Sequence, residues 1–173
     1  MNDIYVGSLF SEDYLAHHGI LGMKWGIRRY QNEDGTLTSA GKKRYSRVLK
    51  MDKDSSLLER KSSKNKNGSI TRQYDITSGN KKIGDSFVDD YSDGHSHIDW
   101  LGIKGKNQGK GYGSKALDAI LEDCVKRGRK YVTLDAAGLD PRAIHIYEKK
   151  GFKALEKSKN DIWDDLVLMR KDL

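Results

Sequence analysis

The chain has 173 residues, which is enough for one domain with a real core, or for a core domain with a smaller appendage. One third of the residues are charged, and no apolar run approaches the roughly 18 residues that a membrane span needs, which argues against a membrane protein. The N-terminus lacks the basic and apolar regions of a secretion signal, and the single cysteine cannot form an internal disulfide. We therefore expect a cytoplasmic protein.

The net charge of +7 is concentrated in one segment. Residues 40–67 hold ten basic side chains against three acidic ones, and the rest of the chain is balanced. Such a segment can meet a phosphate backbone or an acidic partner, but a solvated basic helix is the more frequent case. No base-reading motif accompanies these charges, so any nucleic-acid contact should be weak, nonspecific and salt-dependent.

The first part of the chain predicts a hairpin and then a basic helix. Asp34 and Gly35, flanked by strand-like residues, are a hairpin signal. Thr38 or Ser39 can cap a helix that begins near Ala40, and the polar residues that follow it indicate a linker. We accordingly divide the chain into an N-terminal region, a basic helix with its linker, and a folded domain, with boundaries at 1–45, 46–68 and 69–173.

From Ser69 onward the pattern becomes regular. Three strand-like stretches with short polar connections predict an antiparallel meander, and a glycine-rich loop follows them. Apolar residues at helical spacing then predict a helix from about Gly113 to Arg127, with Cys124 on its buried side. A strand, a short helix and two final strands complete the chain. The predicted fold class is mixed α+β, with a mostly antiparallel central sheet flanked by helices.

The glycine-rich loop predicts an anion-binding site, because glycines allow positive φ and bring backbone N–H groups together at a helix N-terminus. Its spacing does not satisfy a Walker motif. Gly111, Gly113 and Ala116 have the Gly-x-Gly-x-x-Ala spacing of a dinucleotide-binding fold, and Asp135 ends the next strand. The long gap between the preceding strand and Gly111, together with the short chain left after Asp135, disfavours that fold.

Two motifs point instead to one family. The sequence QGKGYG, Gln108 to Gly113, resembles the Arg/Gln-x-x-Gly-x-Gly/Ala pyrophosphate loop of the GNAT acetyltransferases, and it follows a β-meander as in that family. The sequence AIHIYEKKGF, Ala143 to Phe152, resembles the family's Ala-x-x-x-Tyr-x-x-x-Gly-Phe stretch. The resemblance covers about residues 69–173. It implies a GNAT-like sheet with two splayed strands and acetyl-CoA as the acyl-donor cosubstrate, with no metal.

The resemblance also implies how acetyl-CoA is held. Lys106, Lys110 and Lys115 would pair with the phosphate charges that the loop itself does not neutralise. Backbone N–H groups around Leu101 to Ile103 would stabilise the oxyanion that forms when an amine attacks the thioester. The cofactor-binding residues so implied are Leu101, Ile103, Gln108, Gly109, Lys110, Gly111, Tyr112, Gly113 and Ser114.

Three side chains are candidates for acid–base chemistry. Tyr147 matches the family tyrosine that commonly protonates the departing thiolate, although its ring could equally pack between helix and sheet. The family base lies on the strand before the loop, which makes His97 a candidate unless it is an ordinary exposed strand residue. Asp99 should share its face, because strand side chains alternate. The family often carries Asn where this chain has Asp140.

A second resemblance concerns HHGILGMKWGIRRYQNEDGTLTSAGKKRY, residues 17–45. This tract is similar to one that recurs in proteins of tailed bacteriophages and prophages, often near head-assembly functions, which implies a phage origin. The adjacent His17 and His18 do not predict a metal site, because no Cys or acidic ligand cluster accompanies them.

Two functions stay open at this stage. The first is a phage-encoded N-acetyltransferase acting on a protein lysine, an N-terminus or a small amine. The second is a virion-associated or host-interaction module, in which residues 1–66 dock to a phage structural protein or a host protein and the GNAT-like fold is a non-catalytic scaffold.

Overall fold

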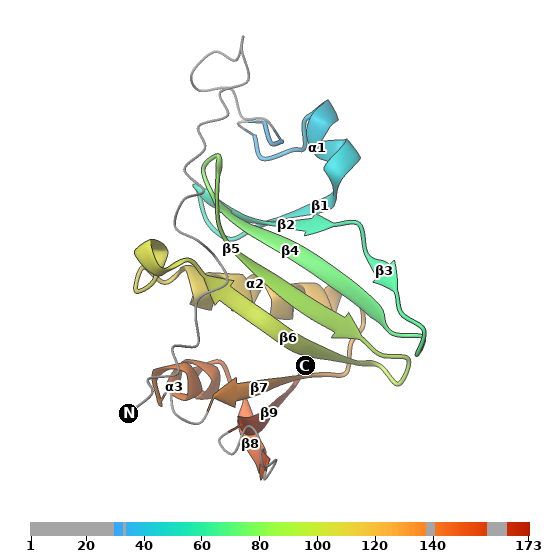
Figure 1. The fold of residues 1–173 in the computed structure, drawn as a ribbon, viewed down its shortest axis with the longest axis vertical. Helices are drawn as coiled ribbons and strands as arrows, with labels where there is room; N and C mark the ends of the chain where they lie inside the picture. The colour runs from blue at the N-terminus through green and yellow to red at the C-terminus, as the bar shows by residue number, and fades with distance from the viewer. Residues whose placement is uncertain (1–29, 33, 138–140, 159–165) are drawn as a thin grey trace, which may run out of the picture.

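A computed structural model describes residues 30–32, 34–137, 141–158 and 166–173. Nine strands form one sheet with the order β1-β2-β4-β5-β6-β7-β9-β8, and the short β3 pairs with β4 (Figure 1). The strands are β1 Tyr45–Lys50, β2 Ser55–Arg60, β3 Ser63–Lys64, β4 Ile70–Ser78, β5 Lys81–Asp90, β6 His95–Ile103, β7 Tyr131–Ala137, β8 Lys153–Ser158 and β9 Leu166–Asp172. The helices are α1 Ser39–Arg44, the 3-10 helix η1 Gly105–Asn107, α2 Tyr112–Lys126 and α3 Pro141–Lys149.

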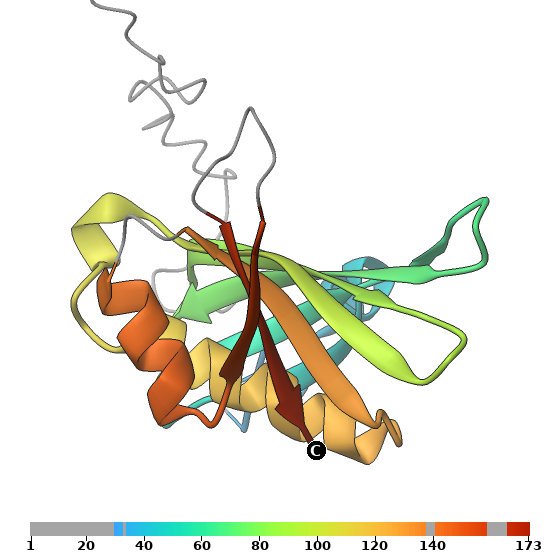
Figure 2. The same ribbon diagram turned by 90° about the horizontal axis from the view of Figure 1, so that it is seen from below.

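The predicted fold class is confirmed. Every strand pairing in the described residues is antiparallel except the pairing of β6 with β7. Figure 2, which views the sheet from below, shows α2 and α3 on the same side of it. No helix within the described ranges is long and apolar enough to span a membrane.

The expected hairpin forms, and the basic helix begins where it was expected but is much shorter. Gln31 bridges Leu37 around a turn in which Gly35 has a φ of 87°, and Thr38 caps α1 by accepting a hydrogen bond from Gly41 N at 3.1 Å. The helix nevertheless ends at Arg44, and residues 45–50 and 55–60 are strands. The prediction of a basic helix within 46–68 is therefore wrong.

Burial explains why this segment is extended. In β2, Leu57 is completely buried and Leu58 is 3% exposed, so both faces of the strand are covered. A strand also directs Arg60 to the buried carboxylate of Asp75, where Nη2 donates to Oδ2 at 3.0 Å. Local helix propensity is a weak preference that such tertiary contacts override. The domain boundaries stay a prediction, although β2 pairs directly with β4 across the one at residue 69.

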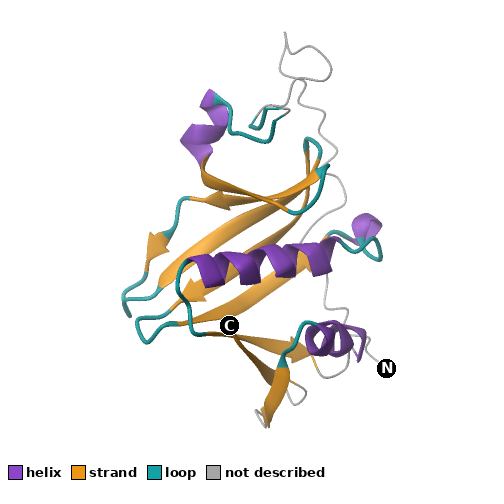
Figure 3. Cartoon of the chain, turned by 180° about the vertical axis from the view of Figure 1, so that it is seen from behind, coloured by secondary structure: helices purple, strands orange, loops and turns teal. Residues whose placement is uncertain are grey.

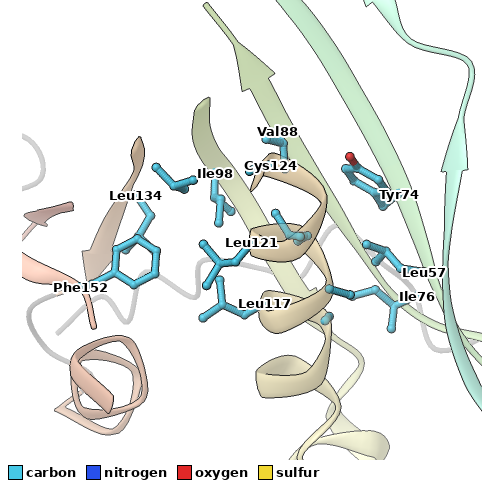
Figure 4. Close-up of a cluster of buried hydrophobic side chains, with 14 of the residues drawn as sticks. Leu57, Tyr74, Ile76, Val88, Ile98, Leu117, Leu121, Cys124, Leu134 and Phe152 are labelled. Carbon is cyan, nitrogen blue, oxygen red and sulfur yellow. The ribbon is translucent and has the colours of Figure 1, made fainter. Parts of the chain in front are cut away.

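The hydrophobic core lies between α2 and the face of the sheet that it covers (Figure 3). Figure 4 shows Leu117, Leu121 and Cys124 of α2 within this cluster, with Tyr74 among the sheet residues and Phe152 near α3. Cys124 is fully buried, as its place in the helical pattern predicted, and burial raises the pKa of its thiol. It is a packing residue.

A closed ring of six alternating charges joins the C-terminal half of α2 to the strands β1, β2, β4 and β5. On the sheet, Arg47 contacts Glu59 at 2.8 Å, and Arg72 bridges Glu59 at 2.5 Å and Asp90 at 2.7 Å. We call this set the charge ring, and its members are Arg47, Glu59, Arg72, Asp90, Arg127 and Asp123.

The helix side closes the charge ring. Arg127 contacts Asp90 and donates from Nε to Asp123 Oδ2 at 2.9 Å, and Arg47 donates to the same oxygen at 2.7 Å. Tyr74 Oη lies 3.2 Å from that oxygen as a further donor. The carboxylate side chains of the ring expose 5% of their surface or less. Buried carboxylates need such partners, because an unpaired charge inside a protein is strongly unfavourable.

Strands β6 and β7 separate partway along their length. They pair in parallel from His95 opposite Tyr131 to Ile98 opposite Leu134. Beyond that point β6 continues to Ile103 and pairs only with β5, while β7 continues to Ala137 and pairs only with β9. The expected splay is therefore present, and it opens toward the glycine-rich loop that follows β6.

We predict that Asp123→Ala destabilises the fold by about 3–5 kcal/mol, because it breaks the ring by removing the buried carboxylate that Arg47 and Arg127 share. Glu122→Ala is the matched control, since its side chain is 72% exposed and meets Lys126 only at 3.8 Å. Its expected cost is within about 0.5 kcal/mol. Urea denaturation measures both, and equal losses for the two variants would contradict a structural role for the ring.

A second prediction concerns acid. Burial alone would raise the pKa of Asp90, but hydrogen bonds from Ser96, Arg127 and Arg72 hold this pKa below its ordinary value. The carboxylate therefore contributes stability above about pH 4, and this contribution is lost as the pH falls through the folded-state pKa. The free energy of unfolding should fall less steeply between pH 5 and pH 3, roughly, in Asp90→Asn than in the wild type. Parallel urea titrations with identical slopes would refute this.

Candidate active site

The loop between β6 and α2 presents its backbone in an open setting. Gly109 and Gly111 have φ values of 72° and 78°, in the left-handed region that glycine occupies without steric cost. A Cβ built on either glycine would meet no described atom within 4 Å. Backbone conformation therefore requires glycine at these positions, and the surface of the loop is open to the approach of a ligand.

The first turn of α2 supplies N–H donors to this surface. Gly111 is the N-cap and has no side chain to accept a hydrogen bond, and the first acceptor inside the helix is Gly111 O, which Lys115 N reaches at 3.1 Å. The N–H groups of Tyr112, Gly113 and Ser114 consequently have no acceptor within the helix. The helix dipole adds positive potential at the same place, which favours an anion.

Gln108 anchors the loop to the end of β6. Its Nε2 donates to Ile103 O at 2.8 Å, and its backbone N donates to Gly105 O at 3.0 Å. Lys104 N donates to Ile83 O of β5 at 2.9 Å. These three bonds fix the start of the loop relative to the sheet, so the Gln108 side chain positions the backbone of the glycines.

The three lysines expected near a phosphate differ in their surroundings. Lys106 and Lys110 are exposed. Lys115 instead pairs with Asp52 of the β1–β2 turn at 2.7 Å, and this hydrogen bond lowers the pKa of the Asp52 carboxyl. Sequence reasoning missed Asp52, because nothing in a 63-residue separation indicates that the two side chains meet. Tyr112 Oη lies 3.1 Å from Ser78 Oγ, which holds the same turn of α2 against β4.

The opened part of β6 carries the residues expected to face the thioester. Leu101 and Ile103 are partly buried against the core and pair on one side with Ser86 and Gly84 of β5. On the other side no strand of the described chain pairs with them. An extended strand directs its N–H groups alternately to both sides, so donors here are available to a ligand lying in the splay.

His97 lies next to the last residue pair of the parallel β6–β7 ladder. Its Nδ1 is 2.9 Å from Thr133 Oγ1, and its Nε2 is 3.8 Å from Asp135 Oδ2. Its side chain is 21% exposed. Thr133 and Asp135 were not predicted as partners of His97, although their spacing of two on one strand places them on a common face.

Asp99 occupies a β-bulge. Phe87 pairs with Trp100 and Val88 with Ile98, so Asp99 is an extra residue in β6 without a partner in β5. The alternation from which we expected Asp99 to share a face with His97 is interrupted here, because a bulge reorients the residues that follow it. Asp99 and Trp100 are accordingly both exposed.

Trp100 is the most prominent residue that sequence reasoning missed. Its side chain is 53% exposed, and its Nε1 donates to Asp85 Oδ1 at 2.9 Å. A Cβ on Gly102 would lie 2.5–2.8 Å from ring atoms of Trp100, so the indole rests over that glycine. The absence of a side chain at Gly102 thus allows the ring to lie on the opened part of β6.

Tyr147 lies on α3 with its ring packed against the core. The ring meets Phe152 edge-to-face with centroids 6.0 Å apart. The packing role considered for Tyr147 is therefore observed, and its role as a proton donor stays a prediction. Asp140, His17 and His18 lie outside the described residues. Among the residues that are described, no group of His, Cys, Asp and Glu side chains is arranged to hold a metal ion.

Comparisons with known proteins agree with this arrangement. Residues 70–152 match the model of the acetyltransferase (GNAT) family, and residues 8–32 match a family of unknown function (DUF7211). The matched acetyltransferase segment contains β4 to α3, including the loop, the splay and Tyr147.

Solved structures give the same fold. A GNAT family acetyltransferase from Elizabethkingia anophelis with acetyl-CoA bound aligns with a TM-score of 0.55 and 16% identity, covering 60% of this chain and 76% of that one. A Bacillus subtilis acetyltransferase in complex with CoA aligns at 0.52 with 21% identity, covering 60% and 77%. A spermidine N-acetyltransferase from Vibrio cholerae in complex with CoA and spermine aligns at 0.52 with 21% identity, covering 59% and 65%.

The N-terminal tract at residues 8–32 is thus shared with proteins whose function is unknown, and the phage connection is not part of that match. The segment from Ile70 to Phe152 matches the acetyltransferase (GNAT) family model, and the sheet with its flanking helices has the fold of GNAT structures.

Proposed function

We propose that this protein is an acetyl-CoA-dependent N-acetyltransferase. One observation carries the proposal: a loop with two left-handed glycines and a helix N-terminus lies directly after a strand whose other edge is opened by the splay. The first feature suits a pyrophosphate and the second suits an extended chain that hydrogen-bonds to backbone. Both lie within the segment that matches the GNAT family.

The residues present fit acetyl-CoA. Gly109 and Gly111 leave open space at the loop, and the N–H groups of residues 112–114 provide donors for the pyrophosphate. Exposed Lys106 and Lys110 can approach the remaining phosphate charge. Lys115 is held by Asp52, so it orders the β1–β2 turn beside α2 unless phosphate displaces the carboxylate.

The chemistry requires an oxyanion site, a base and an acid. When bound, acetyl-CoA supplies a thioester carbonyl that an amine can attack. Backbone N–H groups from Leu101 to Ile103 would stabilise the negative charge that develops on the carbonyl oxygen. A protonated lysine amine has a pKa near 10.4, so it must lose a proton first, to His97, Asp99 or water. Tyr147 would protonate the departing thiolate.

The acceptor is an amine whose identity stays open among a protein lysine, an N-terminus and a small molecule. Carboxylates lie on the opened strands and on the neighbouring β5, at Asp99, Asp135 and Asp85. Along β6, the exposed Trp100 lies between Asp99 and the residue that pairs with Asp85. Negative potential and an aromatic face both attract ammonium groups, which supports an amine acceptor.

The setting of the reaction is also part of the proposal. The resemblance of residues 17–45 to a tract of tailed-phage proteins supports a phage or prophage origin, with the enzyme in the cytoplasm of the host cell or associated with the virion. If no acetyl transfer occurs, the better explanation is an interaction module. In that module residues 1–66 dock to a partner and the GNAT-like fold is a non-catalytic scaffold.

Isotope-labelled acetyl-CoA tests the activity directly. The protein is incubated with the label and a panel of amines, and separately with bacterial lysate, and products are identified by mass spectrometry. We expect label on the nitrogen of at least one amine. Binding of acetyl-CoA without transfer to any acceptor would support the scaffold instead.

The first prediction from this proposal concerns the loop. Gly111→Asp should abolish acetyl-CoA binding, because it places a side chain and a negative charge at a left-handed position in the cradle. Gly128→Asp is the matched control: its φ is 70°, a Cβ there also meets nothing within 4 Å, and it lies at the other end of α2. Calorimetry should show binding in the control alone. Equal binding by both variants would exclude the loop as the pyrophosphate site.

The second prediction concerns Tyr147. Tyr147→Phe keeps the ring that packs against Phe152 and removes only the hydroxyl. Turnover should fall by about 10²–10⁴, with the lower end expected because a thiolate is a tolerable leaving group. Acetyl-CoA affinity and melting temperature should stay close to the wild type. Normal turnover in this variant would show that another acid or water protonates the thiolate.

A further inference from the structure

A polar cleft lies at the opposite end of α2 from the glycine-rich loop. Its volume is about 410 Å³, and its lining residues are Gly68, Ile70, Arg72, Asp90, Tyr91, Ser92, Arg127 and Arg129. The 15 residues of α2 separate the two places by roughly 22 Å. The cleft therefore lies far from the proposed acetyl-CoA site.

Two of its arginines and its carboxylate are already satisfied by the charge ring. Arg72 is hydrogen-bonded to Asp90 and Glu59, and Arg127 to Asp90 and Asp123. Asp90 accepts on both oxygens, because Ser96 donates to Oδ1 at 2.6 Å while the arginines meet Oδ2. The negative charge of Asp90 is thus balanced within the ring and does not repel a ligand strongly.

Arg129 is the additional cation. Its Nη2 donates to the backbone oxygens of Tyr91 and His95, which are uncharged. Its Nε is buried and has no hydrogen-bond partner among the described residues, and the nearest carboxylate oxygen in ion-pair range, Asp90 Oδ1, is 3.9 Å away. The ring contributes three cations and three anions, so the ring and Arg129 together carry one excess positive charge. The nearby Asp93 interacts with Arg129 from outside the ring, with a side chain that is 57% exposed.

This excess charge lies in a partly buried setting. The side chains of Arg72, Arg127 and Arg129 are only 13–19% exposed, so water screens their field less than it would on the surface. Cations near a helix C-terminus also stabilise the helix dipole, and Arg127 occupies that place on α2 already. Arg129 follows the helix and lines the cleft.

We propose that this cleft binds a phosphate group, with Arg129 as its principal contact. The planar guanidinium donates paired hydrogen bonds that match the oxygens of a phosphate. The cleft falls within the usual range of small-molecule sites and exceeds what a single ion fills. The phosphate can therefore come from free inorganic phosphate or from a small phosphomonoester, and the experiment separates these sources.

Calorimetry in chloride buffer at low ionic strength tests the site with inorganic phosphate and, in a second arm, with glycerol 3-phosphate. We expect the wild type to bind, and Arg129→Gln to weaken binding by roughly tenfold or more. Lys130→Gln removes the same charge from an exposed neighbour outside the cleft and should change affinity by less than about twofold. Tighter binding of the ester than of phosphate identifies a phosphomonoester as the ligand, and equal binding identifies the free ion.

Acetyl-CoA separates this proposal from the proposed function. Arg129→Gln should bind acetyl-CoA like the wild type, whereas Gly111→Asp should lose acetyl-CoA and keep phosphate. Loss of phosphate in Gly111→Asp with retention in Arg129→Gln would place the anion on the glycine-rich loop and overturn the inference, as would no binding to the wild type. Should Arg129→Gln fail to fold, Arg129→Lys keeps the charge without the planar fork. Wild-type phosphate affinity in Arg129→Lys would then contradict the assigned contact.

Discussion

The charge ring determines where α2 lies on the sheet. Hydrophobic contacts beneath the helix are non-directional and would tolerate a small rotation or shift of α2. Asp123 of α2 accepts a hydrogen bond from Arg47 of β1, and Arg127, the C-cap of α2, contacts Asp90 of β5, and those bonds require a particular position and distance. Because α2 is rigid, fixing its C-terminal half also fixes its first turn, where the glycine-rich loop ends.

The candidate active site consists largely of backbone groups that secondary structure leaves unpaired. The splay leaves one edge of β6 without a strand, and the N-terminus of α2 leaves its first N–H groups without an acceptor. Such groups are unfavourable when buried dry, so they persist where water or a ligand reaches them. The side chains around them support this backbone, since Gln108 holds the loop and Gly102 makes room for Trp100.

Most of the fold from β4 to α3 was predictable, because each element there has a local signal. The glycines at 109 and 111 mark the loop, and apolar residues at helical spacing mark α2. The strands β1 and β2 were not predictable, because their conformation depends on contacts with residues far along the chain, such as that of Arg47 with Asp123. The bulge at Asp99 and the contact of Lys115 with Asp52 were not predicted either, because each depends on how separate segments of the chain meet in the fold.

The contacts of β1 and β2 with residues far along the chain also limit how the protein can be shortened. The segment recognised by similarity begins at Ile70 and ends at Phe152, but it omits Arg47 and Glu59, two members of the charge ring. It also omits β9, which pairs with β7 along its whole length. The portion of the chain that carries the family likeness is therefore smaller than the sheet and the charge ring to which it belongs. Without β1 and β2, Asp123 would lose Arg47 and Arg72 would lose Glu59, so the ring would be open on the side of the sheet.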